Sequence, residues 1–467
     1  MPLILGTNSI KDTGYNVANS CRFNDGDSAY MHKTPGSAGN QIAFTISLWC
    51  KRGTLGTKQT LFSAVNDANN ETECHFETDD TLNFRDNEGG SWMIQKRTSQ
   101  VFRDCSAWYH LVFSSVSGTQ KIWVNGVEVT SWHTNTNGTG TATWNDDNVM
   151  TVGAKNDGSS PQDYFDGYIA EFVSIDGSTL TPTSFGEFDE DSPTIWKPID
   201  VSGLTFGTNG FYLDFEDSSN LGNDANGGTD LTEVNLAAVD QATDTPTNNF
   251  CTLNPVITDA TYNNTFTEGN MRVVTTAAHW TQSGSTIGIT AGKWYWEGKY
   301  IDSNDPNGTI GVKESAFASQ GLGDKGGTAN GYNGTIFSND GYAVVNNTND
   351  TGYGSSWSGD DIISVAFDAD NMKIYFAING TWQDSGDPTS GATGTGAANV
   401  TTISGGDNVW LPFFTTHKSA WEANFGGCPA FAISSGNADG NGYGNFEYAP
   451  PSGFLALCTK NLGSDGG

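Results

Sequence analysis

Carboxylates in two predicted loops are the side chains in this sequence best suited to bind a metal ion. Asp146 and Asp147 lie in "WNDDN" at 144–148, and Asp163 lies in "DGSSPQDYFDG" at 157–167. Ca²⁺ prefers oxygen ligands from Asp, Asn and backbone carbonyl groups, which such loops supply close together. These three residues are therefore the predicted ligands of a Ca²⁺ ion, and the sequence indicates no other cofactor.

Aromatic side chains beside predicted loops are candidates for binding sugars, because the apolar face of a sugar ring stacks on an aromatic platform. Most of the 14 Trp and 15 Tyr residues are expected in a core. The candidates for recognition flank loops instead, and they are Trp132, His133 and Trp144 in the first half and Tyr332, Tyr353 and Trp382 in the second.

The sequence contains no motif of a familiar catalytic apparatus. Gly-x-Ser-x-Gly, His-Glu-x-x-His and Gly-x-x-x-x-Gly-Lys are all missing. A glycosidase needs two carboxylates facing a cleft roughly 5 to 10 Å apart. Paired acids such as Asp79-Asp80 and Asp360-Asp361 fall mostly at predicted turns, which Asp favours for local reasons. We therefore expect a protein that is not an enzyme.

The charge of the chain excludes several classes of partner. Its 53 acidic and 21 basic residues give a net charge of −32. Because phosphate groups are bound by clustered Lys and Arg, neither nucleic acid nor an anionic membrane is an expected partner. The start of the chain has no basic region, and no window approaches about 18 apolar residues, so we expect neither a signal peptide nor a membrane span. Synthesis in a cytoplasm is the corresponding prediction.

Two hairpins with the same turn must position many of these residues. "KIWVNGVEV" at 121–129 and "KIYFAINGTWQ" at 373–383 both alternate apolar and polar residues around Asn-Gly. Asn-Gly accepts the positive φ angles of the type I′ turn, which matches the twist of the flanking strands. The similarity of the two hairpin sequences is therefore explained by the same turn requirement in both. If one hairpin tip contacts a ligand, Trp382 makes the second tip the stronger candidate.

Short strand patterns separated by Gly, Asn and Asp recur throughout both halves, and 467 residues exceed the usual size of a single core. The predicted fold class is all-β, with two antiparallel β-sandwich (jelly-roll) domains in tandem. The predicted parts are an N-terminal arm at 1–20, a first sandwich at 21–234, a linker or inter-domain seam at 235–264 and a second sandwich at 265–467.

The first half resembles a laminin-G-like (concanavalin A-like) jelly roll over residues 20 to about 180. In that pattern a Trp-x-His strand precedes a strand ending in Asn-Gly, and a Phe-x-Gly-x-Ile strand closes the domain. The matching residues here are Trp108, His110, Asn125, Gly126, Phe165, Gly167 and Ile169. The resemblance implies that His110 is structural.

The second half resembles a SPRY domain. "GKWYWEGKY", "IGV", "GDDIISVAFDADNMKIYFAINGTW", "LPFF", "NFG" and "PPSGFLAL" follow one another in the order of that pattern. The matching residues include Trp294, Trp296, Glu297, Asp360, Asn379 and Gly380.

Stretches along nearly the whole chain are similar to virion structural proteins of marine tailed phages, among them "GFYLDFEDSSNLGNDANGG" and "TDTPTNNFCTLNP". The resemblance implies a component of the virion surface, displayed as a fibre, spike or capsid decoration. Its expected partners are other virion proteins, host-surface glycans and further copies of itself. A carbohydrate-binding protein without a virion role and a polysaccharide depolymerase are the alternatives.

Overall fold

The chain folds into two compact units built mainly of strands. The first unit is Thr13–Thr247, and the second is Asn248–Gly467 together with Met1–Asp12. The predicted all-β fold class is confirmed. The computed structural model describes Ile4 and residues 14–157, 160–258, 264–276, 278–318, 334–346, 348–350, 352–402 and 404–465.

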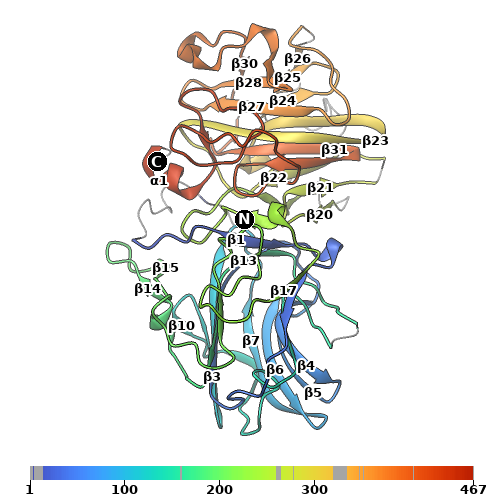
Figure 1. Ribbon diagram of the computed structural model, residues 1–467. Coiled ribbons are helices and arrows are strands. Elements are labelled where there is room, and N and C mark those ends of the chain that lie inside the picture. The colour runs from blue at the N-terminus through green and yellow to red at the C-terminus, as the bar shows by residue number, and fades with distance from the viewer. Residues whose placement is uncertain are drawn as a thin grey trace. The chain divides into compact units, whose positions relative to one another are not determined.

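Two facing antiparallel sheets form the first unit (Figure 1). Within the described residues, the strands of the sheet that we call the β3 sheet are, in spatial order, β10 (Val127–Glu128), β9 (Thr119–Val124), β8 (Trp108–Val116), β3 (Phe44–Arg52), β13 (Gly167–Asp176), β1 (Ser20–Phe23) and β18 (Gln241–Ala242), with β16 (Phe211–Leu213) beside β13. Those of the β5 sheet are β11 (Trp132–Thr136), β7 (Ser91–Val101), β6 (Thr81–Glu88), β5 (Asn70–Phe76), β4 (Gln59–Asp67), β12 (Val149–Val152), β2 (Tyr30–Lys33) and β17 (Thr232–Val234).

Side chains that alternate along the strands meet between these sheets and form the main core. The ring of Phe62 in β4 lies 5.3 Å from that of Phe113 in β8 and 6.2 Å from that of Phe172 in β13, measured between centroids. Burying an aromatic or aliphatic side chain of this size contributes about 1.5–3 kcal/mol. The period-2 pattern of the sequence therefore selects which face of each strand turns inward.

The β3 sheet is buried on its other face as well. All nine residues of β3 are buried, although "FTISLWCKR" includes the polar or charged residues Thr45, Ser47, Lys51 and Arg52. The second apolar cluster combines residues of β8, β9 and β13 with residues that follow β13 in the chain: Val112, Trp123, Val173, Ile175, Phe185, Val201, Phe206 and Tyr212. Polar groups inside this double layer must find partners in the protein.

The buried imidazole of His110 finds hydrogen-bond partners in two side chains of the same unit. The indole N–H of Trp196 donates to its Nδ1 at 2.8 Å, so the proton is on Nε2, which donates to Ser47 Oγ at 2.9 Å. Its ring also stacks on Trp49 with 4.6 Å between centroids. Burial lowers the pKa of His110 to about 3, so the imidazole is neutral at pH 7. Its role is structural, as the resemblance implies.

In the second unit the described strands join into one hydrogen-bonded sheet, whose main path is β19 (Leu253–Thr258), β22 (Thr281–Ser285), β31 (Trp410–Asn424), β23 (Lys293–Glu314), β24 (Gly334–Ser338), β25 (Ala343–Val345) and β26 (Thr348–Asp350). Strands off this path are β20 (Thr265–Thr267), β21 (Arg272–Val274), β27 (Ile362–Asp368), β28 (Lys373–Ile378), β29 (Thr381–Trp382), β30 (Ala398–Asn399) and β32 (Leu455–Ala456).

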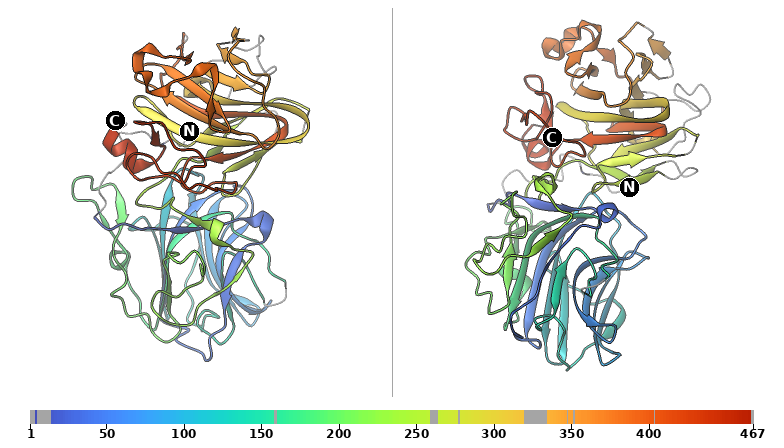
Figure 2. Two further views of the ribbon diagram at one scale, coloured as in Figure 1. Left: turned by 45° about the horizontal axis from the view of Figure 1, so that its top comes forward. Right: turned by 45° about the vertical axis from the view of Figure 1, so that its right-hand side comes forward.

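The long strands β23 and β31 hold the second unit together. They pair from Glu297 opposite Asn424 to Glu314 opposite Trp410, and Figure 2 shows them side by side in yellow and red-orange. An aromatic cluster packs against them. The ring centroid of Trp421 lies 5.1 Å from that of Tyr300 and 5.3 Å from that of Trp357.

The remaining elements are short. They are a small sheet of β14 (Gly186–Phe188) and β15 (Trp196–Pro198), the 3₁₀ turns η2 (Asp25–Asp27), η3 (Pro182–Ser184), η4 (Ala238–Asp240), η5 (Ser315–Phe317), η6 (Gln383–Ser385) and η7 (Pro388–Thr393), and the helix α1 (Thr459–Asp465). In the part of the chain that the structure describes, no helix has the length and apolar character of a membrane span.

The predicted parts map onto these units as follows. Of the predicted arm at 1–20, residues 1–3 and 5–13 lie outside the described residues, and β1 begins at Ser20. The boundary between the units follows Thr247 and falls inside the segment 235–264. Before that boundary β18 pairs with β1, and the carboxylate of Asp244 forms a buried ion pair with Lys51 at 2.7 Å. After it, β19 joins the sheet of the second unit.

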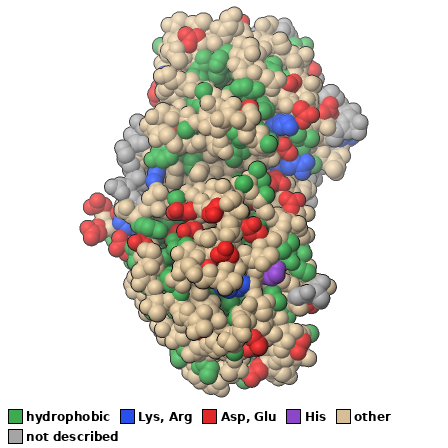
Figure 3. Space-filling model, viewed as in Figure 1, with side chains coloured by type: hydrophobic (Ala, Val, Ile, Leu, Met, Phe, Trp, Pro, Cys, Tyr) green, Lys and Arg blue, Asp and Glu red, His purple; other side chains and the backbone are tan. Residues whose placement is uncertain are grey.

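Acidic side chains are scattered over the surface. On the face shown in Figure 3, red Asp and Glu groups lie dispersed among neutral side chains, and blue Lys and Arg groups are few. A continuous basic stripe is the usual footprint of a nucleic-acid site. The visible face carries no such stripe.

Acid should destabilise the first unit through His110. Histidine in the unfolded chain has a pKa of about 6.5. Below that pH the unfolded chain binds a proton at this residue, whereas folded His110 stays neutral. The free energy of unfolding therefore falls by about 1.4 kcal/mol per pH unit until about pH 3. Between about pH 7 and pH 5, the unfolding free energy of the native protein should therefore fall by about 2 kcal/mol more than that of His110→Gln in urea titrations. The control is Val239→Ala, which changes an exposed residue without a titratable group in the same unit and should follow the native protein. A difference between native and His110→Gln that does not change with pH would contradict the neutral, buried state.

Candidate ligand-binding groove

Two of the predicted recognition residues are core residues rather than surface platforms. Trp144 is 0% exposed and Tyr353 is 2% exposed. The indole N–H of Trp144 donates to Ser174 Oγ at 3.2 Å, and Tyr353 Oη accepts from the backbone N–H of Phe376 at 3.3 Å. Neither ring has a face available to a sugar, because their hydrophobic surfaces complete the two main cores.

Of the other two predicted recognition residues in the second half, the structure describes Trp382 but not Tyr332. Tyr332 lies outside the described residues. Trp382 in β29 is partly buried and packs against an apolar cluster that contains Phe250 and Tyr295. Its ring therefore contributes to packing beside the second hairpin.

The predicted Ca²⁺ ligands do not form one cluster. Asp163 pairs with Lys58, with 2.7 Å between Oδ2 and Nζ, and Asp146 accepts from the side chain of Asn148 at 2.8 Å. Asp147 is exposed. Among the residues that the structure describes, no group of three or more His, Cys, Asp or Glu side chains is placed to hold a metal ion. A Ca²⁺ site that combines these residues with Asn and backbone oxygens stays a prediction.

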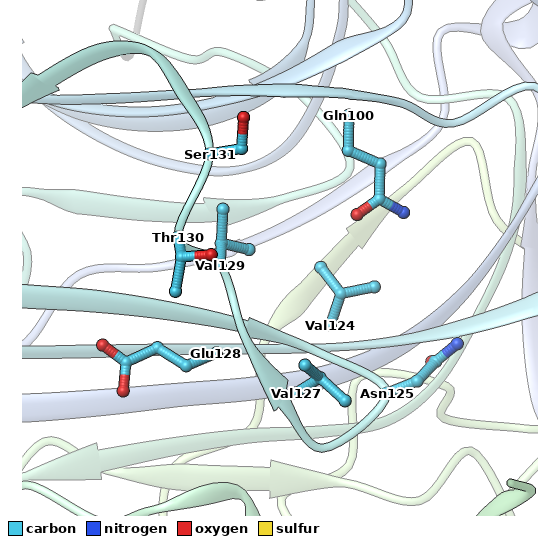
Figure 4. A pocket seen from close by; sticks show the side chains of 8 residues that line it. All are labelled: Gln100, Val124, Asn125, Val127, Glu128, Val129, Thr130 and Ser131. Carbon is cyan, nitrogen blue, oxygen red and sulfur yellow. The ribbon is translucent and has the colours of Figure 1, made fainter.

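A groove of about 320 Å³ lies at the first hairpin (Figure 4). It lies where β10 and β11, the outermost strands of the β3 and β5 sheets, follow one another along the chain. Figure 4 shows Gln100, from the end of β7, extending toward Val124 across from the segment 127–131. The lining residues are Gln100, Val124, Asn125, Val127, Glu128, Val129, Thr130 and Ser131.

The Asn-Gly turn at the base of the groove is fixed to β8. Asn125 and Gly126 have φ angles of 48° and 77°, so the predicted type I′ hairpin is confirmed. The backbone N–H of Asn125 donates to the carbonyl oxygen of His110 at 2.9 Å, and its side-chain oxygen accepts from the N–H of His110 at 2.8 Å. The turn therefore holds the groove in a defined place relative to the core.

The second hairpin uses the same device. Asn379 and Gly380 have φ angles of 47° and 79°, and Asn379 exchanges a backbone and a side-chain hydrogen bond with Ile362, both at 2.9 Å. In both hairpins the side-chain oxygen of the turn Asn therefore accepts a hydrogen bond from a backbone N–H of the neighbouring strand. The sequence motif predicts the positive φ angles but not these partners.

Apolar, neutral polar and charged side chains all line the groove. Val127 is 61% exposed, and the hydroxyl and amide groups of Gln100, Thr130 and Ser131 are at the surface. The carboxylate of Glu128 pairs with Lys121 at 3.0 Å, which compensates its charge. An apolar patch beside neutral polar groups is typical of small-molecule sites, whose volumes begin at about 300 Å³.

Trp132 and His133 directly follow the groove. Trp132 comes after Ser131, packs partly on the edge of the main core and has Lys96 Nζ 5.1 Å from its ring centroid. His133 is exposed and lies 3.3 Å from the hydroxyl of Thr134. The structure thus brings these two predicted residues to the border of the groove, whereas Trp144 is a core residue of the same unit.

Sequence reasoning missed a charged cluster on β5. Glu71, Glu73 and His75 alternate in "ETECHF", so they share the face of the β5 sheet that points away from the core. Lys58, Arg85 and Lys155 surround Glu73, with 2.8 Å, 2.7 Å and 3.8 Å between charged atoms. Burial alone would raise the pKa of Glu73, but His75, Lys58 and Arg85 together hold that pKa well below its usual range. The period-2 spacing of charged residues is the signal that identifies this cluster.

Comparison with known proteins supports the fold of the first unit. Residues 24–184 match the family described as the concanavalin A-like lectin/glucanases superfamily (Laminin_G_3). The predicted laminin-G-like resemblance is confirmed, and the first unit contains a concanavalin A-like domain. No curated protein sequence matches the chain.

Solved structures similar to parts of the chain include three proteins of different kinds. A heptameric SAP-like pentraxin from Limulus polyphemus is 15% identical, with coverage of 36% of this chain and 80% of the pentraxin and a TM-score of 0.28. The SPRY domain of human HERC1 is 14% identical, with coverage of 37% and 96% and a TM-score of 0.26. Domain 4 of AbnA, a GH43 extracellular arabinanase from Geobacillus stearothermophilus in complex with arabinotriose, is 26% identical, with coverage of 31% and 65% and a TM-score of 0.25.

The position of the groove should depend on the absence of a side chain at Gly126. A Cβ at this residue would lie 2.4 Å from the ring of Trp196, whereas a Cβ at Gly177, which also has a positive φ, would meet nothing within 4 Å. Gly177→Ala should cost roughly 1 kcal/mol from backbone strain alone. Gly126→Ala should cost at least twice as much in urea unfolding, because the Trp196–His110 contact must also move. Equal losses for the two variants would show that the turn is not fixed in this way.

Proposed function

We propose that the protein binds glycans through the groove at the first hairpin, as a non-enzymatic component of a tailed-phage virion surface. The observation that carries the glycan proposal is the exposure of Val127 beside Gln100, Thr130 and Ser131 in a groove of about 320 Å³. The lectin-containing superfamily of the matched domain supports the same ligand class.

The chemistry of the groove fits a neutral sugar. A sugar ring presents C–H groups on its faces and hydroxyl groups at its rim, so it needs an apolar contact bordered by groups that both donate and accept. Val127 provides the apolar contact. Hydroxyl and carboxamide groups donate and accept, whereas the one carboxylate of the groove is already paired with Lys121.

The virion part of the proposal is supported by the stretches that are similar to structural proteins of marine tailed phages. Two strand-rich units, whose described residues include the short helix α1 but no long one, suit a compact appendage or capsid decoration. The expected partners are neighbouring virion proteins, further copies of the chain and glycans of the host surface. The net charge of −32 requires that subunit contacts include counterions or a basic partner.

The alternatives are a carbohydrate-binding protein without a virion role and a polysaccharide depolymerase. Glu71 and Glu73 lie near each other, since Lys155 Nζ is 2.6 Å from the first carboxylate and 3.8 Å from the second. A glycosidase needs a carboxylic acid with a raised pKa as proton donor. The lowered pKa of Glu73 favours a structural ion pair instead.

Replacing the exposed apolar contact should weaken glycan binding. Val127→Lys places a hydrated cation where a sugar face would rest, and we expect a loss of affinity of about tenfold or more, equivalent to about 1.4 kcal/mol. The measurement is binding of the purified full chain to an array of bacterial surface glycans, followed by titration with the best neutral glycan. Val239→Lys is the matched control, because Val239 is 63% exposed and lies outside the groove.

Two results would contradict this assignment. Equal affinities of the native protein and Val127→Lys would remove the groove as the site. Failure of the native protein to bind any glycan of the array would overturn the proposed ligand class.

The virion role has a separate test. Mass spectrometry of purified phage particles should detect the chain as a stoichiometric component, and labelled antibodies should place it on their surface. Detection only in the lysate of infected cells, with none on particles, would favour the carbohydrate-binding alternative without a virion role.

A further inference from the structure

The face of the β5 sheet that points away from the core carries a row of hydrogen-bonding side chains across the sheet. Their neighbours along each strand, such as Phe62, Phe84 and Met150, point into the core. From β11 to β17 the paired residues of this row are Thr136, Gln95, Arg85, Glu73, Ser63, Thr151, His32 and Thr232.

The centre of this row is closed, whereas one end of it is accessible. Glu73, Ser63 and Thr151 are 0% exposed. The Ser63 hydroxyl donates to the carbonyl oxygen of Ala154 at 2.9 Å, and Lys155 reaches the carboxylates of β5. Toward β7 and β11, by contrast, Gln95 is partly exposed and Thr136 is exposed.

Trp92 stands at this accessible end. Trp92 is 40% exposed, and its ring lies on the same face of the sheet as Arg85. The guanidinium carbon of Arg85 lies 4.3 Å from its ring centroid, and Glu73 holds that guanidinium through Nε and Nη2 at 3.1 Å and 2.7 Å. The indole is therefore held in a fixed orientation by a buried ion pair.

A hollow of about 120 Å³ lies on the same face, next to β5. Its lining includes Glu71, Lys155 and Gln162. Lys155 Nζ and Glu71 Oε2 are 2.6 Å apart, so the hollow offers a donor and an acceptor side by side, which is the pattern that a sugar hydroxyl matches. In the register of the sheet Glu71 is opposite Asn87, and Asn87 is opposite Trp92. Two strand spacings, about 10 Å, therefore separate the hollow from the Trp92 platform.

The charges of this surface compensate one another. Arg85 and Lys155 face Glu71 and Glu73, and Lys58 bridges Glu73 and Asp163. Asp157 adds a further carboxylate to the lining of the hollow. Because these three cations are each paired with carboxylates, the surface disfavours an anionic ligand. An aromatic platform combined with paired donors and acceptors fits a neutral ligand that is longer than one sugar ring.

We propose that Trp92, Arg85 and the hollow beside Glu71 and Lys155 form a second site, which binds a neutral oligosaccharide of two or more rings. The inference rests on the proposed glycan-binding function, but it assigns a surface of the β5 sheet that is separate from the groove at the first hairpin. Trp92 stacks on one ring, and the Glu71–Lys155 pair exchanges hydrogen bonds with the hydroxyl groups of the next.

The test is titration of the full chain with cellotriose, maltotriose and chitotriose, with trigalacturonate as an anionic probe, by calorimetry. At least one neutral trisaccharide should bind, Trp92→Ala should lower that affinity at least tenfold, and Trp92→Phe should retain part of it. Ile42→Ala is the control, because Ile42 is 40% exposed like Trp92 and lines neither the groove nor the hollow, and it should bind as the native protein does. Thermal unfolding of each variant verifies that it is folded.

The outcomes separate this site from the groove. Loss of trisaccharide binding in Trp92→Ala but not in Val127→Lys would support the second site. Unchanged binding in Trp92→Ala together with loss in Val127→Lys would overturn it and leave the proposed function intact. Binding of trigalacturonate alone would overturn the neutral ligand class, and no binding of any probe or array glycan would overturn both proposals.

Discussion

Burial of the β3 sheet on both faces is the constraint on which the first unit depends. A sheet enclosed in this way has no water to satisfy its polar groups, so each one needs a partner from the chain. His110 is the clearest case, since Trp196, Ser47 and Trp49 surround its ring while its backbone binds the Asn125 turn. The hairpin that builds the groove is thus fixed by a core residue.

The two sheets of the first unit are covered differently on their outer faces, and this difference determines where the two proposed sites lie. The β3 sheet is covered over β8, β9 and β13 by the chain that follows β13, and the groove lies at its edge strand β10. The outer face of the β5 sheet is closed at its centre, where Glu73 forms ion pairs with Lys58, Arg85 and Lys155. In a chain with only 21 Lys and Arg residues, this use of basic side chains inside ion pairs leaves few cations that could bind an anionic partner.

Strand alternation and turn chemistry predict much of the fold, but they predict the site only in part. The two Asn-Gly hairpins and the all-β class follow from local patterns, because type I′ geometry and period-2 burial are local properties. Trp144 and Trp92 show the limit. Both lie near polar loop residues in the sequence, yet Trp144 fills the core and Trp92 is exposed. Which ring turns outward depends on packing against distant strands, and a single sequence does not contain that information. Trp132 and His133 border the groove because the strand after the first hairpin begins there.

The doubly anchored Asn-Gly turn also constrains how this surface can diversify. Any insertion between Asn125 and Gly126 would break two hydrogen bonds to β8 and move a backbone that lies directly beneath the Trp196 ring. In the following segment Val129 packs against the main core, whereas Thr130 and Ser131 are exposed. Engineered changes of specificity should therefore be tolerated best at Thr130 and Ser131, whereas the tip of the hairpin should tolerate few changes.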